Sequence, residues 1–299
     1  MSKMNVTKEF IEKHWPLTDV VIHNMPKQGM AGHVGIIAAR EGKYTYKIPG
    51  PWKTPENFNR DLSAYEFLNQ KQFPYISKLL HTREGERYVK SEGKFLCLIE
   101  YIEGDHPAWS AETYSELGKI VATLHSIKDF PFYSDYKPSS AIKQRIETID
   151  KEDFDFKDEL VKIISSVKSF EGQNLTMVPI HTEITPGNVI QQPDGKIMVI
   201  DWDEVGTGAA VVDLGVGLIN HMITEDLEIK EDWIKAYYSA YFALRPMSDR
   251  EKEFIWEAAV YWACLWVGYG NTEKRWKKIL WALENKDKIT SHYIDKSKH

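Results

Sequence analysis

HTEITPGNVIQQPDGKIMVIDWDE, residues 181–204, is the part of the chain from which the fold can be predicted. It places His181, Glu183 and Asn188 in one loop, and Asp201 follows at the end of an apolar run. The Pro-Asp-Gly turn in between predicts a small hairpin that brings Asp201 back beside Asn188. A carboxylate and an amide oxygen suit Mg²⁺, a hard cation that takes few ligands from protein. Glu183 supplies a second carboxylate that can orient a hydroxyl nucleophile, so the stretch has the parts that phosphoryl transfer needs.

The same stretch resembles the catalytic loop of the aminoglycoside phosphotransferase and choline kinase superfamily, to which homoserine, methylthioribose and fructosamine kinases are similar. That family carries H-G-D-x-x-x-x-N followed by an I-D-W segment. The family pattern is matched closely here by Pro186-Gly187-Asn188 and by Ile200-Asp201-Trp202. The resemblance implies that Asn188 and Asp201 bind the metal and that His181 braces the loop. Asp213, in VVDLG, resembles the structural aspartate that follows in the family. The implied architecture is a bilobal, protein-kinase-like α+β fold with a small antiparallel-sheet N-lobe and a larger, mostly helical C-lobe.

The match departs from the family in its catalytic position. Glu183 stands where the family has its catalytic Asp, and Thr182 stands where the family has the preceding Gly. Glu is one methylene longer, and a displacement of about 1 Å at a reacting group can cost ~10²-fold in rate. A positioned base contributes typically ~10² to 10⁴-fold. Glu183 is therefore an adapted base, an impaired base in a non-catalytic homologue, or an engineered change.

The rest of the chain changes character near residue 103. Before it, alternating apolar residues and turn residues are typical of hairpins, and after Glu103-Gly104 apolar residues recur at helical spacing. Strands are expected at 20–23, 34–39, 43–48, 87–91 and 94–102, a helix at 55–69, helices at 117–124, 140–148, 156–169 and from about 211 onward, and the small hairpin at 189–191 and 196–200. We therefore expect an N-lobe of residues 1–102 and a C-lobe of residues 103–299.

The N-lobe of such a fold covers the nucleotide. Gly29, Gly32 and Gly35 lie between two predicted strands, where glycines let backbone N–H groups approach phosphates closely. A plain turn is the alternative interpretation, and the chain has no G-x-x-x-x-G-K-[ST] pattern of a Walker-type NTPase. The resemblance places Lys47, in YTYKIPG, at the α/β-phosphates.

An acidic partner for Lys47 is expected on the helix that follows. Asp61 shares an apolar stripe with Phe58 and Tyr65, and an unpaired buried charge is costly. The resemblance therefore pairs Asp61 with Lys47. Because the family has the longer Glu at this position, Glu66 is the fallback partner.

The linker after the second hairpin resembles the family's hinge. It reads IEYIEG, and the backbone of Glu100, Tyr101 and Ile102 would meet the edge of the purine base. The side chains do not distinguish adenine from guanine, so ATP and GTP both remain open.

Candidate acceptor-binding residues lie in the C-terminal half. Trp262 and Trp266 share a helix, and such aromatic stripes form either core or the wall of a pocket that stacks on a sugar or a quaternary amine. Glu225 and Asp226 belong to an acidic run that forms either a solvated face or a surface attracting a polycation such as an aminoglycoside. Asp203 is counted with these candidates.

Composition excludes several classes of protein. The 299 residues carry 38 basic and 44 acidic side chains, a net charge of -6, which argues against non-specific nucleic-acid binding. Two cysteines exclude a disulfide scaffold. The N-terminus lacks the apolar core of a signal peptide, and the most apolar stretch, 258–270, is too short to span a membrane. We expect a cytoplasmic monomer or homodimer that binds neither membrane nor nucleic acid.

Two hypotheses of function follow. The first is an ATP- or GTP-dependent kinase that uses Mg²⁺ and transfers the γ-phosphoryl group to a hydroxyl of a polar acceptor, cationic or neutral. That acceptor is either an aminoglycoside-like antibiotic, which implies a resistance role, or a metabolite. The second is a nucleotide-binding pseudokinase, because Glu183 replaces the family's catalytic Asp.

Overall fold

The computed structural model describes residues 6–24, 32–51, 53–133, 138–149, 151, 154–167, 170, 173–203 and 205–294. Contacts divide the chain into two compact units. The sheet unit comprises residues 1–105 and 190–202, and the helical unit comprises residues 106–189 and 203–299. The segment 190–202 thus belongs with the sheet, whereas the division expected from the sequence put it with residues 103–299.

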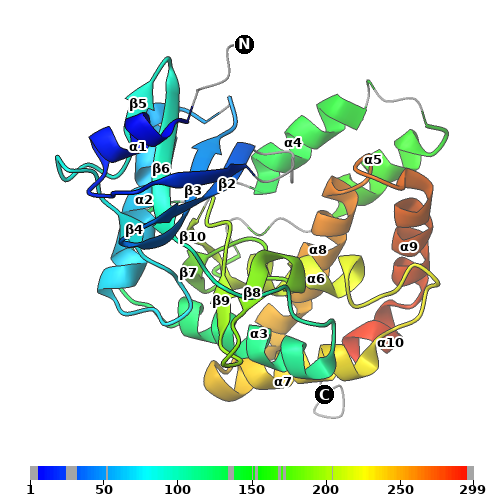
Figure 1. The fold of residues 1–299 in the computed structure, drawn as a ribbon. Coiled ribbons are helices and arrows are strands. Elements are labelled where there is room, and N and C mark those ends of the chain that lie inside the picture. Colours follow the sequence, from blue (N-terminus) through cyan, green and yellow to red (C-terminus); the bar gives the residue numbers. More distant parts are fainter. Residues whose placement is uncertain are drawn as a thin grey trace. The chain divides into compact units, whose positions relative to one another are not determined.

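An antiparallel sheet forms the centre of the sheet unit (Figure 1). Its order is β1-β2-β3-β6-β4, and β5 pairs with β6. The strands are β1 (Val21–Asn24), β2 (Gly32–Ala39), β3 (Gly42–Pro49), β4 (Leu79–Leu80), β5 (Val89–Ser91) and β6 (Lys94–Glu100), and the helices are α1 (Lys8–His14) and α2 (Pro55–Gln70). Both predicted hairpins and the helix between them are confirmed, while α1 and β4 were not predicted.

Alternation along β3 explains how this sheet acquires its core. Tyr44, Tyr46 and Ile48 are buried in one cluster with Ile11 and Trp15, the apolar residues at α1. The residues between them face the other way, which leaves that side of β3 for polar groups. The helix α2 begins with Thr54 as N-cap and Pro at its first position, a combination that favours helix initiation.

A small hairpin completes the sheet unit. It is formed by β8 (Val189–Gln191) and β9 (Ile197–Val199), as the sequence predicts. The N–H of Val199 donates to the carbonyl of Tyr75 (2.8 Å), and Gln191 bridges to Asp105. These bonds explain why the hairpin belongs with the sheet.

The helical unit consists mainly of helices packed in pairs. Its elements are α3 (Ala111–His125), α4 (Pro138–Ile149), α5 (Lys157–Ser166), β7 (Met177–Ile180), the 3₁₀ turn η1 (Pro186–Asn188), β10 (Gly206–Ala209), α6 (Ala210–Asn220), α7 (Glu231–Leu244), α8 (Asp249–Leu265), α9 (Thr272–Glu284) and α10 (Lys286–Thr290). The short pair β7–β10 was not predicted.

Close approach of α6 and α8 defines the middle of this unit. A Cβ at Gly215 would lie 2.5 Å from the Cβ of Ala258, so glycine is required for this contact. Every residue of α6 from Ala210 to Ile219 is buried. Across the described residues, no helix combines the length and the apolar character needed to cross a membrane.

Candidate functional site

The predicted loop of residues 181–188 follows β7 in the helical unit, and its backbone is held by Asp213 of α6. The N–H of His181 donates to Oδ2 of Asp213 (3.0 Å), and the N–H of Thr182 donates to Oδ1 (2.6 Å). Asp213 is 1% exposed. Hydrogen bonds to an ionised, buried acceptor are among the stronger ones in proteins, so this carboxylate fixes the start of the loop.

Asp213 is held in turn by a histidine. Nε2 of His125 lies 3.1 Å from Oδ2 of Asp213, and Nδ1 lies 2.9 Å from the hydroxyl of Tyr241. Burial lowers the pKa of His125, although the Asp213 carboxylate opposes this shift. A neutral ring therefore donates from Nε2 to the carboxylate and accepts from the tyrosine at Nδ1. His125 is thus a packed histidine.

The loop itself presents a carboxylate and an amide. The N–H of Glu183 donates to Nδ1 of His181 (3.3 Å), which gives His181 the bracing contact expected of it. Nδ2 of Asn188 donates to the carbonyl of Glu183 (3.1 Å). With its NH₂ group used in this way, Asn188 has its amide oxygen available to a cation, because no described residue donates to that oxygen.

Thr182 has a backbone conformation that favours glycine. Its φ is 75°, and a β-branched residue rarely adopts this left-handed region. The family pattern has Gly here, a residue that adopts this region without a steric cost. Sequence reasoning noted the substitution but gave no signal of the backbone strain.

The sheet unit brings two further predicted residues together. Nζ of Lys47 on β3 lies 2.9 Å from Oδ1 of Asp201, although the two are 154 residues apart. Asp201 follows β9 with a φ of 60°, and its side chain is 49% exposed. The next residue, Trp202, is buried against the rings of Tyr65 and Phe73. The packed tryptophan and the left-handed turn thus set the position of the Asp201 carboxylate.

Each unit offers an oxygen donor of the kind that a hard divalent cation takes. In the sheet unit the Asp201 carboxylate already faces an ammonium group, and in the helical unit Asn188 has an amide oxygen. Nowhere in the described part of the chain do three or more His, Cys, Asp or Glu side chains form a group that could hold a metal. A cation that keeps several water and phosphate ligands, as Mg²⁺ does, suits such a sparse set.

Comparison with known proteins identifies the family. A model of the APH phosphotransferase enzyme family matches residues 36–249. The chain belongs to this family. A homoserine kinase of Zymomonas mobilis subsp. mobilis is 22% identical over 208 residues, which span 66% of this chain and 64% of that protein. The chain thus matches somewhat less than two thirds of that relative's length.

Solved structures show the same fold. A choline kinase from Streptococcus pneumoniae has a TM-score of 0.62 and 17% identity, with 96% of each chain covered. A spectinomycin phosphotransferase, solved with ADP and spectinomycin, has a TM-score of 0.62 and 15% identity, with 95% of each chain covered. The predicted α+β fold, with an antiparallel sheet in the N-terminal part and a mostly helical remainder, is therefore confirmed.

One contact expected from the sequence is different. The carboxylate of Asp61, which is 4% exposed, pairs with Lys53 and with Arg60 (3.0 Å) rather than with Lys47. The fallback residue, Glu66, pairs with His81 and Arg87. Lys53 lies in the loop between β3 and α2, where the sequence offers no periodic pattern from which its direction could be predicted.

Two of the three predicted glycines lie in the described part of the chain. Gly29 lies outside the described residues. Gly32 and Gly35 lie within β2, not in a loop between strands, which corrects the prediction for both. A Cβ at Gly35 would lie 2.3 Å from the ring of Tyr46, so this glycine makes room for a core side chain.

In the predicted hinge, two of the three backbone N–H groups already donate hydrogen bonds to other residues of the chain. The N–H of Glu100 donates to the carbonyl of Lys78 (2.8 Å), and that of Tyr101 donates to the carbonyl of Lys43 (3.0 Å). Among the described residues, the N–H of Ile102 has no such partner. Ile102 is therefore the one of the three whose amide is best placed to bond a ligand.

The acceptor candidates lie in different environments. Trp262 is 8% exposed and donates from Nε1 to the carbonyl of Val212 (2.9 Å), so it is a core residue and not a pocket wall. Trp266 is partly exposed, and the guanidinium of Arg275 lies 6.0 Å from its ring centre. Glu225 and Asp226 are exposed, and Glu225 pairs with Lys274. Asp203 is half-buried.

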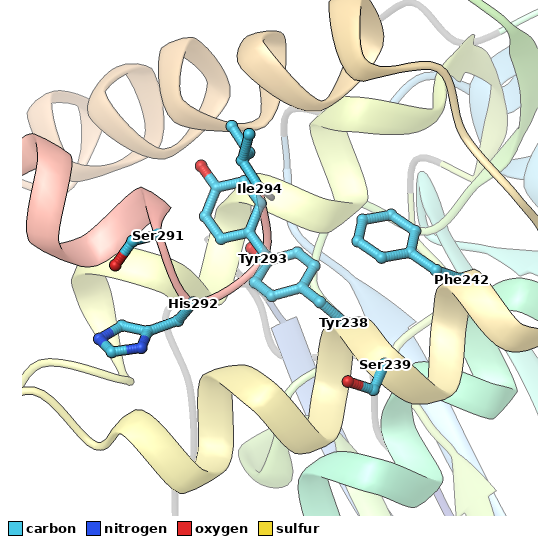
Figure 2. A pocket seen from close by; sticks show the side chains of 7 residues that line it. All are labelled: Tyr238, Ser239, Phe242, Ser291, His292, Tyr293 and Ile294. Carbon is cyan, nitrogen blue, oxygen red and sulfur yellow. The ribbon is translucent and has the colours of Figure 1, made fainter. Parts of the chain in front are cut away.

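A cavity of about 400 Å³ lies between α7 and residues 291–294, which follow α10. Figure 2 shows the rings of Tyr293, Tyr238 and Phe242 side by side, with the ring of His292 directed away from them. The rings of Tyr238 and Tyr293 are 4.6 Å apart. None of the predicted site residues lines this cavity.

Proposed function

We propose that this chain is a kinase that transfers the γ-phosphoryl group of ATP or GTP to a hydroxyl of a small polar acceptor. The observation that carries the proposal is the contact of Lys47 with Asp201, the two residues that the family resemblance assigns to the phosphates and to the metal. Membership of the phosphotransferase family supports it. So does the similar fold of a spectinomycin phosphotransferase that was solved with ADP and spectinomycin.

Each residue has a role in this proposal. Lys47 binds the α/β-phosphates, and the amide of Ile102 bonds the base. Glu183 accepts the proton of the acceptor hydroxyl at a carboxylate oxygen while that hydroxyl attacks the γ-phosphorus. Asn188 and Asp201 hold Mg²⁺, which neutralises phosphate charge when bound.

The acceptor is tested with a panel chosen from the relatives. The panel consists of homoserine, choline and spectinomycin, because similar proteins include a homoserine kinase, a choline kinase and a spectinomycin phosphotransferase. Acceptor-dependent release of ADP or GDP, measured with each nucleotide, identifies the pair. Asp201→Ala should abolish turnover, and a variant that keeps the wild-type rate would overturn the proposal.

A second candidate function is a nucleotide-binding pseudokinase. The residues Thr182 and Glu183, both of which depart from the family pattern, favour it. Glu183→Asp distinguishes the two functions. A large gain in transfer means that Glu183 impairs the wild-type chain, whereas a loss means that Glu183 is an adapted base.

A further inference from the structure

Two lysines and two acids in the sheet unit are paired differently from the family pattern. Asp61 pairs with Lys53, and the two side chains are 4% and 8% exposed. Asp201 pairs with Lys47, and these side chains are 49% and 17% exposed. The pair of Asp61 and Lys53 is therefore deeply buried, whereas in the pair of Asp201 and Lys47 the Asp201 side chain is exposed to solvent.

The buried pair has no room for another cation. Arg60 already lies 3.0 Å from the second oxygen of Asp61, so both carboxylate oxygens face a positive group. A buried charge that loses its partner is strongly unfavourable, which keeps Lys53 at Asp61. Lys47 consequently has Asp201 as its acidic partner.

The exposed pair places an ammonium group where a metal ion would have to bind. The backbone of Asp201 is positioned by the left-handed turn at φ 60° and by the buried Trp202 that follows it. An ammonium at 2.9 Å from its Oδ1 repels a divalent cation that approaches the same carboxylate. Nucleotide phosphates would attract both cations and remove this conflict.

We propose that Lys47 is the resident counter-ion of Asp201 in the nucleotide-free protein, and that a divalent cation binds Asp201 in exchange for Lys47. This inference rests on the proposed function, because it takes Asp201 as a metal ligand and Lys47 as a phosphate ligand. It adds an order of events: metal binds weakly until nucleotide phosphates draw Lys47 away. Lys53, which the sequence did not single out, makes this exchange possible by occupying Asp61.

Mn²⁺ alone is the probe, measured by calorimetry and by electron paramagnetic resonance without nucleotide. Lys47→Met should bind Mn²⁺ at least about tenfold more tightly than the wild type, because the repulsion is removed. Lys47→Arg keeps the charge and should bind as weakly as the wild type. Lys43→Met is the matched control, because Lys43 lies on the same strand and pairs with the exposed Glu103.

In a second measurement, the same substitution should change nucleotide affinity in the opposite direction to Mn²⁺ affinity. With ATP or GTP and Mg²⁺ present, Lys47→Met should bind nucleotide more weakly than the wild type, because its phosphate ligand is lost. Equal Mn²⁺ affinity in Lys47→Met and the wild type would overturn the exchange. If Asp201→Asn leaves Mn²⁺ binding of Lys47→Met unchanged, the metal assignment of the proposed function fails instead, so the two failures are distinguishable.

Discussion

Replacing Asp213 with Asn tests how the loop of residues 181–188 is held. Three N–H donors face this carboxylate: the amide of His181 and the ring of His125 at Oδ2, and the amide of Thr182 at Oδ1. An asparagine offers one oxygen and one NH₂ group. Whichever way the amide turns, its NH₂ group faces at least one of these donors and a hydrogen bond is lost.

The smallest loss follows when the NH₂ group replaces Oδ1. The bond from Thr182 is then broken and its N–H is left buried. A hydrogen bond to a charged group contributes about 1.5 to 3 kcal/mol. Losing the charge also weakens the other two bonds, so we expect about 3 kcal/mol of destabilisation. At about 2 to 4 °C per kcal/mol for a chain of this order of size, the melting temperature falls by about 6 to 12 °C.

Thermal unfolding and kcat are the two readouts. The freed loop should lower kcat by about 10² if Glu183 shifts by about 1 Å. Asp249→Asn is the matched control, because Asp249 also lies in the first turn of a helix but pairs with Lys252 at the surface. We expect it to cost less than about 1 kcal/mol. A melting temperature of Asp213→Asn within 2 °C of the wild type, together with normal kcat, would refute this account of the loop.

Three further substitutions test the core and the buried charges. Lys53→Met leaves Asp61 with one cation fewer and should cost about 3 to 5 kcal/mol in denaturant unfolding, whereas the exposed Lys43→Met should cost under about 1 kcal/mol. Gly35→Ala forces a Cβ to 2.3 Å from a buried ring and should cost about 1 to 3 kcal/mol by the same assay. Burial, with Lys278 and Arg275 nearby, lowers the pKa of His221 to about 4, so the unfolded chain binds the extra proton and stability falls as pH drops from about 6.5 toward 4. His221→Gln should reduce that loss by up to about 3 kcal/mol, and an unchanged pH profile of unfolding would contradict the shift.

Periodic segments of this chain were predictable because burial imposes a visible pattern. The alternation in β3 and the apolar stripe of α2 identify both elements, since one face of each must be apolar. The strands β4 and β10 have no such signal. They are two and four residues long, and β10 reads GTGA, so neither has enough apolar residues to show a period.

Site residues were predictable where a motif carries them and not where a contact depends on a loop. Lys47 and Asp201 were singled out from sequence, and they meet. The predicted partner of Asp61, Lys47, was wrong, because Lys53 reaches Asp61 from a connection whose backbone direction no local pattern determines. The negative charge of Asp61 shows that a cationic partner is needed, but the sequence does not distinguish among the several lysines that could provide it.

The departures at Thr182 and Glu183 are best understood from the backbone beneath them. The N–H of Thr182 is held by Asp213 whatever its side chain, so the left-handed φ of 75° is imposed on a residue that does not favour it. Strain of this kind costs about 1 to 3 kcal/mol and persists only when the surroundings over-determine it. Since the backbone at Glu183 is also bonded to His181 and Asn188, the loop cannot retreat to make room for a longer side chain. The extra methylene of Glu183 must therefore be taken up by its side-chain torsions or by the position of the acceptor. Comparing the transfer rates of the wild type and Glu183→Asp thus measures the effect of carboxylate side-chain length on a fixed backbone. Thr182→Gly relieves the strain without moving that backbone, so the ratio of these two rates should be the same when Thr182→Gly is also present.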